Sequence, residues 1–192
     1  MKAIVAFVIW IVSIIFKIEV SGEENIPKDG SCIVCLNHIS VFDPVVILGC
    51  IQRPIRFISK EELSKIPVLG SILKYMNVIP IKRGSGDMGA LKASLKTLKD
   101  GEVLGIFPTG TREKKNPNAP AKSGVVLIAM KSQAPVIPIH IDASYKLFSK
   151  VRVTIGKEID LSLYDGRKLD SEQRQEAADY IYSSIKELGG NK

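Results

Sequence analysis

The residues with the clearest potential for chemistry are His38 and Asp43, which stand five positions apart in residues 37–43, NHISVFD. Imidazole changes its charge close to neutral pH. If the turn folds back on itself, the carboxylate of Asp43 can accept a hydrogen bond from one ring nitrogen, and the other nitrogen can take a proton from a hydroxyl. The spacing therefore allows a general base. It equally allows a surface histidine followed by an ordinary Asp cap on a helix.

Two elements flank this turn and would position it. Residues 31–36, SCIVCL, form a short apolar run that predicts a buried strand. Asp43 and Pro44, followed by apolar residues, predict the start of a helix that includes residues 45–50, with proline in its first turn. His38 would then lie just beyond the carboxyl end of a strand, where open α/β sheets bind their ligands.

Size and charge narrow the classes of protein that the chain can be. Its 192 residues, 45% of them hydrophobic, suit one domain with a single core. Residues 51–99 contain ten Lys or Arg and three acidic residues, an excess equal to the net charge of the whole chain, +7. Such a zone favours an anionic partner, although a solvated basic face is the commoner explanation. Aromatic residues are only 6% of the chain and no nucleic-acid-binding signature is present, so we expect no nucleic-acid partner.

The three cysteines do not form a disulfide framework, which favours a reducing compartment. Cys32 and Cys35 have C-x-x-C spacing, but residues three apart on a strand face opposite sides of a sheet. We therefore expect two core cysteines rather than a redox or metal pair, and we predict no metal site.

An uncharged run of fourteen residues, Ala3–Phe16, lies between Lys2 and Lys17. As a helix it would reach roughly 21 Å, against about 30 Å for the hydrocarbon core of a bilayer. A signal peptide, a buried core helix and an interfacial anchor compete as explanations. We favour the anchor and predict that residues 1–21 attach the protein to the cell membrane as a monotopic protein, with a domain of residues 22–192 on the cytoplasmic side.

The remaining chain alternates between predicted strands and helices, which predicts an α/β domain. The apolar runs are nearly continuous, as expected for a largely buried sheet. The expected strands are residues 31–36, 56–59, 78–81, 103–107, 136–141 and 151–155, and the expected helices are residues 45–50, 68–76, 86–99, 123–131 and 171–188, the last with Ser171 as its cap.

Three later segments, taken with the histidine turn, make the chain resemble the glycerolipid acyltransferases, most closely the 1-acyl-sn-glycerol-3-phosphate acyltransferases. The H-x4-D block of that family matches His38 and Asp43. Its second block matches residues 79–84, IPIKRG, and its third, FPEGTR in the family, matches residues 107–112, FPTGTR. Its fourth matches residues 134–139, APVIPI. The resemblance implies a single-domain glycerol-3-phosphate acyltransferase-like fold, with a mixed sheet flanked by helices and an apolar membrane-anchoring helix at the amino terminus.

The resemblance also implies a role for each matched residue. His38 is the expected base and Asp43 its partner. The residues expected to bind the substrate phosphate are Lys82, Arg83 and Arg112, although a solvated strand end explains Lys82 equally well. The expected substrate-binding loop consists of Thr109, Gly110 and Thr111, with the glycine allowing a tight turn that exposes backbone N–H groups.

Thr109 departs from the family, which has glutamate at this position. Threonine cannot carry the negative charge of a carboxylate, so we expect an impaired or differently tuned site. His140 ends an expected strand, and we predict a structural role for it.

The implied reaction moves a fatty acyl group from acyl-CoA or acyl carrier protein to the sn-2 hydroxyl of lysophosphatidic acid, which gives phosphatidic acid. It needs no bound cofactor, and its partners are the bilayer, the lyso-lipid and the thioester donor. Alternatives are another lysophospholipid or lipid alcohol as acceptor, and a catalytically impaired lipid-binding homologue. A serine hydrolase is disfavoured because the chain has no G-x-S-x-G sequence.

Overall fold

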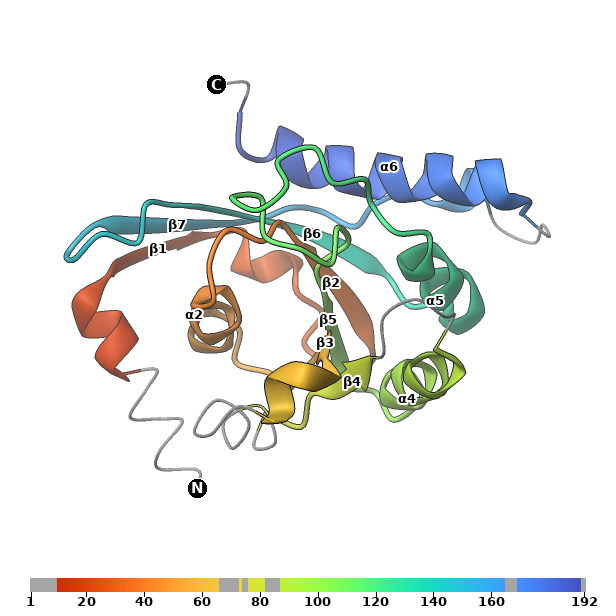
Figure 1. Cartoon of the computed structure of the whole chain (residues 1–192), viewed down its shortest axis with the longest axis horizontal. Coiled ribbons are helices and arrows are strands. Elements are labelled where there is room, and N and C mark those ends of the chain that lie inside the picture. Colours follow the sequence, from red (N-terminus) through yellow and green to blue (C-terminus); the bar gives the residue numbers. More distant parts are fainter. Residues whose placement is uncertain (1–9, 66–72, 74–75, 82–86, 165–168, 191–192) are drawn as a thin grey trace.

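A computed structural model of the chain describes residues 10–65, 73, 76–81, 87–164 and 169–190. Its centre is one seven-stranded sheet with the strand order β1-β7-β6-β2-β5-β3-β4 (Figure 1). Neighbouring strands are parallel except for β6 and β7, which are antiparallel, so the sheet is mixed as expected. The strands are β1 (Lys17–Ser21), β2 (Cys32–Leu36), β3 (Ile55–Lys60), β4 (Ile79–Ile81), β5 (Val103–Ile106), β6 (Val136–Ala143) and β7 (Lys150–Ile155).

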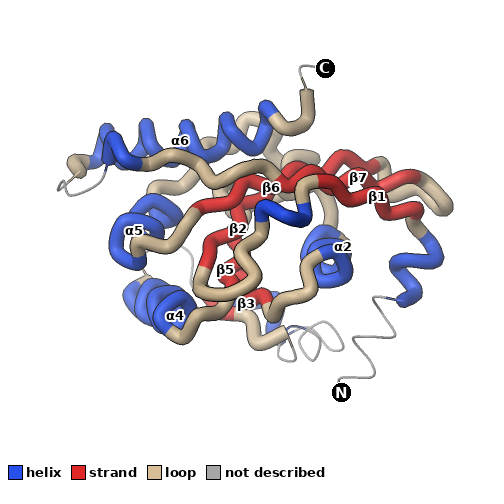
Figure 2. Tube along the Cα trace, turned by 180° about the vertical axis from the view of Figure 1, so that it is seen from behind, coloured by secondary structure: helices blue, strands red, loops and turns tan. Residues whose placement is uncertain are grey.

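Helices cover both faces of this sheet (Figures 1 and 2). One face packs against α4 (Met88–Lys99), α5 (Gly124–Ser132) and α6 (Ser171–Glu187). The other face packs against α2 (Asp43–Cys50) and against residues 10–15, which are helical. Among the residues that the structure describes, three short 3-10 helices lie in the connections: η1 (Glu23–Asn25), η2 (Glu61–Lys65) and η3 (Ser162–Tyr164). Helices on both faces explain why the central strands are apolar along their whole length.

Strand β2 lies in the middle of the sheet and all five of its residues are buried. Its alternate side chains belong to the two different cores, with Cys35 facing α4, α5 and α6 and Cys32 facing α2. The prediction of two core cysteines on opposite faces is therefore confirmed. Burial raises the pKa of the Cys32 thiol to about 11, so this thiol is protonated at neutral pH.

The expected strands and four of the five expected helices are present, with ends that differ by one or two residues. The expected helix of residues 68–76 lies largely outside the described residues. Ser171 is not the cap of α6, because Asp170 holds this position in a capping box with Gln173. The carboxylate of Asp170 accepts the backbone N–H of Gln173 at 2.9 Å, so the helix begins one residue before the position that a cap at Ser171 would give.

Strand β1 was not predicted, because its residues were counted with the amino-terminal segment. Lys17–Ser21 forms an edge strand paired with β7, so the sheet begins within residues 1–21. Part of the expected anchor, residues 1–9, lies outside the described residues. Val12 and Phe16 are buried against the sheet, whereas Trp10 and Ile14 are exposed. Among the described residues, no helix has the length and apolar character needed to cross a bilayer, so the expected anchoring helix is not supported.

Gly105 in β5 leaves room for an aromatic stack that leads toward the histidine turn. A β carbon at this position would collide with the ring of Phe57, which is 2% exposed. We expect Gly105→Ala to lower the free energy of unfolding by about 1–3 kcal/mol, because the rigid ring has to move within a packed core. Chemical denaturation measures this loss.

Gly124→Ala is the matched control for this substitution. A β carbon at Gly124 would meet no heavy atom within 4 Å, and the residue opens α5. The stability of this variant should be unchanged or slightly higher, since alanine restricts the unfolded chain. Equal stability of the two variants would contradict the packing role of Gly105.

Candidate active site

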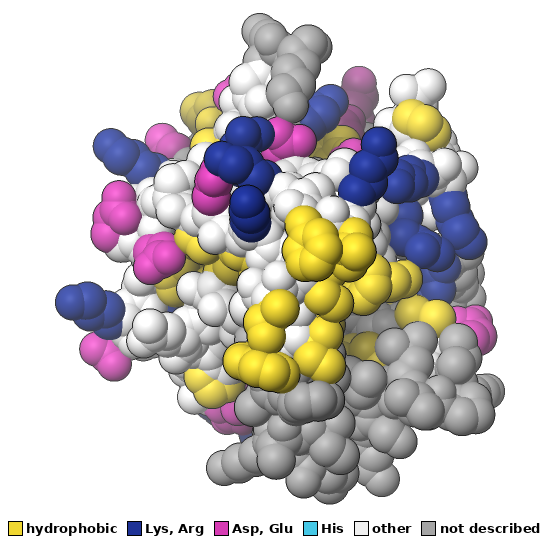
Figure 3. Space-filling view, turned by 90° about the vertical axis from the view of Figure 1, so that its left-hand side faces the viewer, with side chains coloured by type: hydrophobic (Ala, Val, Ile, Leu, Met, Phe, Trp, Pro, Cys, Tyr) yellow, Lys and Arg dark blue, Asp and Glu magenta, His cyan; other side chains and the backbone are white. Residues whose placement is uncertain are grey.

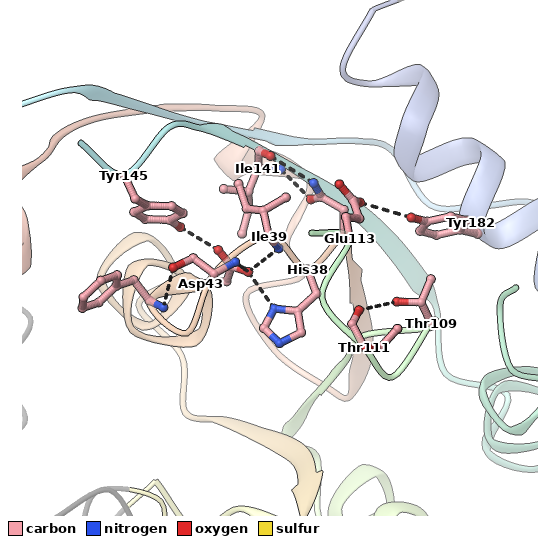
Figure 4. Close-up of polar contacts among 12 residues, drawn as sticks. His38, Ile39, Asp43, Thr109, Thr111, Glu113, Ile141, Tyr145 and Tyr182 are labelled. Carbon is pink, nitrogen blue, oxygen red and sulfur yellow. Dashed lines mark hydrogen bonds and ion pairs between the residues drawn. The ribbon is translucent and has the colours of Figure 1, made fainter. Parts of the chain in front are cut away.

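His38 and Asp43 face one another at the carboxyl end of β2 (Figure 4). Nδ1 of His38 lies 2.7 Å from Oδ2 of Asp43. The carboxylate is completely buried, whereas the imidazole side chain keeps 20% of its surface exposed. The hydrogen bond expected from the sequence is therefore present, and the more exposed partner is the ring that could meet a substrate.

Asp43 does not act as an ordinary helix cap. The cap position of α2 is Phe42, and Asp43 is the first helical residue. Its Oδ2 turns back and accepts the backbone N–H groups of Ile39 and Ser40, each at 2.8 Å, in addition to the imidazole. Its Oδ1 accepts the hydroxyl of Tyr145 at 2.7 Å. The oxygens of a carboxylate accept hydrogen bonds, so the facing Nδ1 of His38 is the donor and carries a hydrogen. This leaves Nε2 as the basic nitrogen.

Asn37 fixes the position of this turn relative to the sheet. Its side chain is 2% exposed and makes two hydrogen bonds with the backbone of Ile141 in β6. Nδ2 donates to the carbonyl oxygen at 3.0 Å, and Oδ1 accepts from the N–H at 2.8 Å. The side-chain amide thus extends the hydrogen-bonded pairing of β2 with β6 beyond the end of β2. The sequence analysis missed this role. The available signal was the position of Asn37, a polar residue directly after a predicted buried strand.

The loop after β5 packs directly on the histidine. The ring of Phe107 stacks on the imidazole of His38 with 4.2 Å between centroids, and Phe57 stacks behind it at 5.7 Å. The backbone N–H of Glu113 donates to the carbonyl oxygen of His38 at 2.8 Å. The third sequence block is therefore brought together with the first, as the resemblance implied.

Thr109, Gly110 and Thr111 form a tight turn beside the imidazole (Figure 4). Thr109 is 5% exposed, and its hydroxyl donates to the carbonyl oxygen of Thr111 at 2.9 Å. Gly110 has a φ of 62°, which glycine adopts without strain. Its N–H donates to the carbonyl oxygen of Phe107, so this N–H is used within the turn. The expectation that the turn exposes backbone N–H groups to a ligand therefore stays a prediction for its other residues.

Of the three cations expected at the site, the structure describes only Arg112. It is half-buried and directly precedes Glu113, which is bonded to the histidine backbone. Lys82 and Arg83 lie outside the described residues. Strand β4, which precedes them, is parallel to β3, β5 and β2, so the chain leaves β4 at the same edge of the sheet as His38.

A further cation, Lys122, lies over the turn and received no role in the sequence analysis. A β carbon at Gly110 would be 3.2 Å from its Nζ. Lys122 is exposed, and its backbone N–H donates to the carbonyl oxygen of Pro108 at 2.9 Å. The ammonium group of Lys122 therefore lies beside residues 107–112, the third matched block.

The other histidine has the predicted structural role. Nδ1 of His140 lies 3.1 Å from the carbonyl oxygen of Ile185, so the ring connects β6 to α6. In the part of the chain that the structure describes, no group of three His, Cys, Asp or Glu side chains is arranged to hold a metal ion.

Comparison with known proteins agrees with this arrangement of blocks. A family model described as Acyltransferase matches residues 17–142. The 1-acyl-sn-glycerol-3-phosphate acyltransferase of Bacillus subtilis (strain 168) is 30% identical over 178 residues, which cover 89% of this chain and 87% of that protein. The protein of the same name from Borreliella burgdorferi is 31% identical over 152 residues, covering 78% of this chain and 60% of that protein.

A solved structure has the same fold. The crystal structure of the 1-acyl-sn-glycerophosphate (LPA) acyltransferase PlsC from Thermotoga maritima superposes with a TM-score of 0.66 and 30% sequence identity, over 91% of this chain and 73% of that chain. The match includes the mixed sheet and its flanking helices. The chain therefore belongs to the Acyltransferase family and is an enzyme of the 1-acylglycerol-3-phosphate O-acyltransferase type.

Proposed function

We propose that the enzyme transfers a fatty acyl group from acyl-CoA or acyl carrier protein to the sn-2 hydroxyl of 1-acyl-sn-glycerol-3-phosphate and so forms phosphatidic acid in phospholipid biosynthesis. The observation that carries the proposal is the partly exposed imidazole of His38, bonded through Nδ1 to the buried carboxylate of Asp43. This arrangement suits the activation of a hydroxyl. The names of the matched relatives support the choice of acceptor.

In the proposed reaction Nε2 of His38 takes the proton of the sn-2 hydroxyl as the oxygen attacks the thioester carbonyl. The tetrahedral intermediate then collapses, the C–S bond breaks, and the imidazolium returns the proton to the departing sulfur. Asp43 keeps the ring oriented and stabilises the imidazolium that forms for a moment. No acyl-enzyme and no bound cofactor are required, because the thioester already carries the activated acyl group.

The phosphate of the acceptor is proposed to bind beside the turn of Thr109, Gly110 and Thr111. Arg112 supplies a guanidinium suited to bidentate contact with phosphate oxygens, and Lys122 lies over the same turn. Lys82 and Arg83 remain proposed phosphate ligands from the sequence. Thr109 cannot supply the family's carboxylate, but its hydroxyl closes the turn that carries Arg112.

The face beside the histidine turn supports attachment to a membrane. Three segments expose large apolar side chains: residues 10–15, the turn before α2, and the β6–β7 connection. Contacts hold the segments together, since the N–H of Phe148 donates to the carbonyl oxygen of Ile15 and the ring of Phe42 packs on Phe16 and Tyr145. The exposed apolar residues on them are Trp10, Ile14, Val41, Phe42, Leu147 and Phe148.

Basic side chains accompany this apolar face, as Figure 3 shows for one side of the molecule. Lys146 is exposed on the β6–β7 connection and Lys17 is exposed at the start of β1, and on β7 Lys150 and Arg152 form ion pairs with Glu19. An apolar patch with cations beside it suits a bilayer that contains anionic lipids. We propose that this face, together with the amino-terminal segment, holds the enzyme on the cytoplasmic surface of the cell membrane, with the domain that begins at β1 outside the bilayer.

We expect His38→Ala to reduce the formation of phosphatidic acid by about 10²–10⁴-fold, because the variant lacks the proposed base. The measurement is mass spectrometry of products made by purified enzyme from one thioester donor and a mixture of lyso-lipids, which also identifies the acceptor. His140→Ala is the matched control. It should lose stability, because a bond to α6 is removed, and keep its activity. Full turnover by His38→Ala would rule out the histidine as base.

Thr109→Val should raise the KM for lysophosphatidic acid, because it leaves the carbonyl oxygen of Thr111 without the hydroxyl that holds the turn. Thr109→Ser keeps this hydroxyl and should behave like the parent. Steady-state kinetics with varied acceptor distinguish the two variants. Identical KM values for both would show that the hydroxyl does not position the substrate-binding loop.

A double substitution, Leu147→Ser with Phe148→Ser, should weaken binding to vesicles that contain anionic lipid by about tenfold or more, since two exposed apolar side chains are lost from the proposed membrane face. Leu163→Ser is the control, because Leu163 is 77% exposed on η3, outside these segments. Sedimentation with vesicles measures the binding. Equal weakening by the control would contradict a localised membrane face.

A further inference from the structure

Tyr145 lies 102 positions after Asp43 in the sequence and meets it at the site (Figure 4). We infer that Tyr145 is a positioning residue of the His38–Asp43 pair, whose hydroxyl fixes the plane of the Asp43 carboxylate and thereby sets the basicity of the imidazole. The inference rests on the proposed function, in which His38 is the base.

The four hydrogen bonds of the carboxylate divide unequally between its oxygens. Oδ2 accepts the imidazole N–H and the N–H groups of Ile39 and Ser40, all from within the turn. Oδ1 accepts the hydroxyl of Tyr145 at 2.7 Å. Because the carboxylate is completely buried, a lost donor at Oδ1 would not be replaced freely by bulk water. The tyrosine therefore fixes the one oxygen that the turn itself does not hold.

The tyrosine is itself held firmly. Its ring packs edge-on against Phe16, with 5.3 Å between centroids, and against Phe42 at 5.8 Å. Its φ is 53°, a left-handed conformation that is uncommon for residues other than glycine, asparagine and aspartate. A residue keeps such a conformation only where its surroundings enforce it. The backbone and ring of Tyr145 are therefore held in place, and the hydroxyl meets Asp43 in a defined position.

The hydroxyl of Tyr145 stays protonated, and so uncharged, near neutral pH. Burial raises the pKa of Tyr145 far above its usual value, and the nearby carboxylate of Asp43 raises it further, so the hydroxyl keeps its proton. On the tyrosine side of the pair the titratable neighbour is Cys50 at the end of α2, and on the His38 side lie Arg112 and Glu113 in the loop after β5 and Lys122 over the turn at Gly110. Burial raises the pKa of the Cys50 thiol to about 12. Cys50 and Tyr145 therefore both keep their protons near neutral pH.

Loss of the hydroxyl should make the pair bind its proton more tightly. A hydrogen bond to Oδ1 withdraws negative charge from the carboxylate, so its removal leaves a carboxylate that stabilises the imidazolium more strongly. The imidazolium would then return its proton to the departing sulfur less readily. The ring of His38 would also be less well oriented. Both effects act on turnover rather than on binding of the acceptor.

The test compares Tyr145→Phe with Tyr180→Phe, the same change on a tyrosine that is 45% exposed on α6. Tyr145→Phe should lower kcat about tenfold with an unchanged KM for lysophosphatidic acid, because one charge-assisted hydrogen bond is lost while the ring is kept. Tyr180→Phe should match the parent in both constants.

A second readout is independent of acyl transfer. The chain has only two histidines, so proton NMR can follow both imidazoles as the pH is varied, with His140 as an internal reference. In Tyr145→Phe the midpoint of the His38 resonance should move to higher pH, while that of His140 stays fixed. Failure of the proposed function alone would leave a parent that transfers no acyl group but still shows this NMR shift on substitution.

Two outcomes would overturn the inference. The first is a Tyr145→Phe variant with the kcat and the His38 titration of the parent, in which case the tyrosine only packs against its aromatic neighbours. The second is a variant that no longer unfolds cooperatively, which would make the hydroxyl a requirement of the fold rather than of the histidine pair.

Discussion

The completely buried carboxylate of Asp43 is the constraint on which the geometry of the site depends. A buried charge is tolerated only when hydrogen bonds replace the water that it has lost. Here the donors come from the imidazole of His38, from two backbone groups of the same turn, and from Tyr145 in the β6–β7 connection. Meeting this requirement fixes the turn after β2, the start of α2 and the connection after β6 in one arrangement. The imidazole is oriented as a consequence, with its other nitrogen left as the base.

The sheet supplies the second level of order. Strands β2, β5, β3 and β4 are parallel neighbours, so the segments that follow them leave the sheet at one edge. The loop after β5 can therefore lay Phe107 on His38 and bond Glu113 to the histidine backbone. On the β6 side, the amide of Asn37 pairs with Ile141 and prevents the turn from shifting along the sheet. A rigid sheet edge of this kind suits a reaction that depends on the orientation of two substrates and on one proton transfer.

The sequence predicted the fold class and most elements because the signals are local. The apolar runs of β2, β5 and β6 and the amphipathic pattern of α6 follow from burial of neighbouring residues. It failed where an element lacks such a signal. Strand β1 at the sheet edge, Lys17–Ser21, contains charged residues and lacks the continuous apolar run that marked the other strands. It was therefore not recognised as a strand and was counted with the segment before it. The amino-terminal segment was expected to anchor the protein at a bilayer, but Val12 and Phe16 face the protein core, and an apolar run looks the same in a sequence whether it is buried in protein or in lipid.

The sequence by itself placed His38 and Asp43 within reach of one another, since five residues of separation around a tight turn can bring the two side chains together, but the same spacing also fits a surface histidine beside a helix cap. It also determined the division of Cys32 and Cys35 between two faces, and the resemblance to the acyltransferases implied the tight turn at Gly110. Only the tertiary structure decided which groups hold Asp43 and His38 in place. Tyr145, Phe107 and Ile141 come from strands and loops between 69 and 104 positions away, and the pairing order of the sheet alone brings them to the turn. Local patterns record which residues are buried, whereas a contact across the sheet depends on topology and register, which a single sequence does not express.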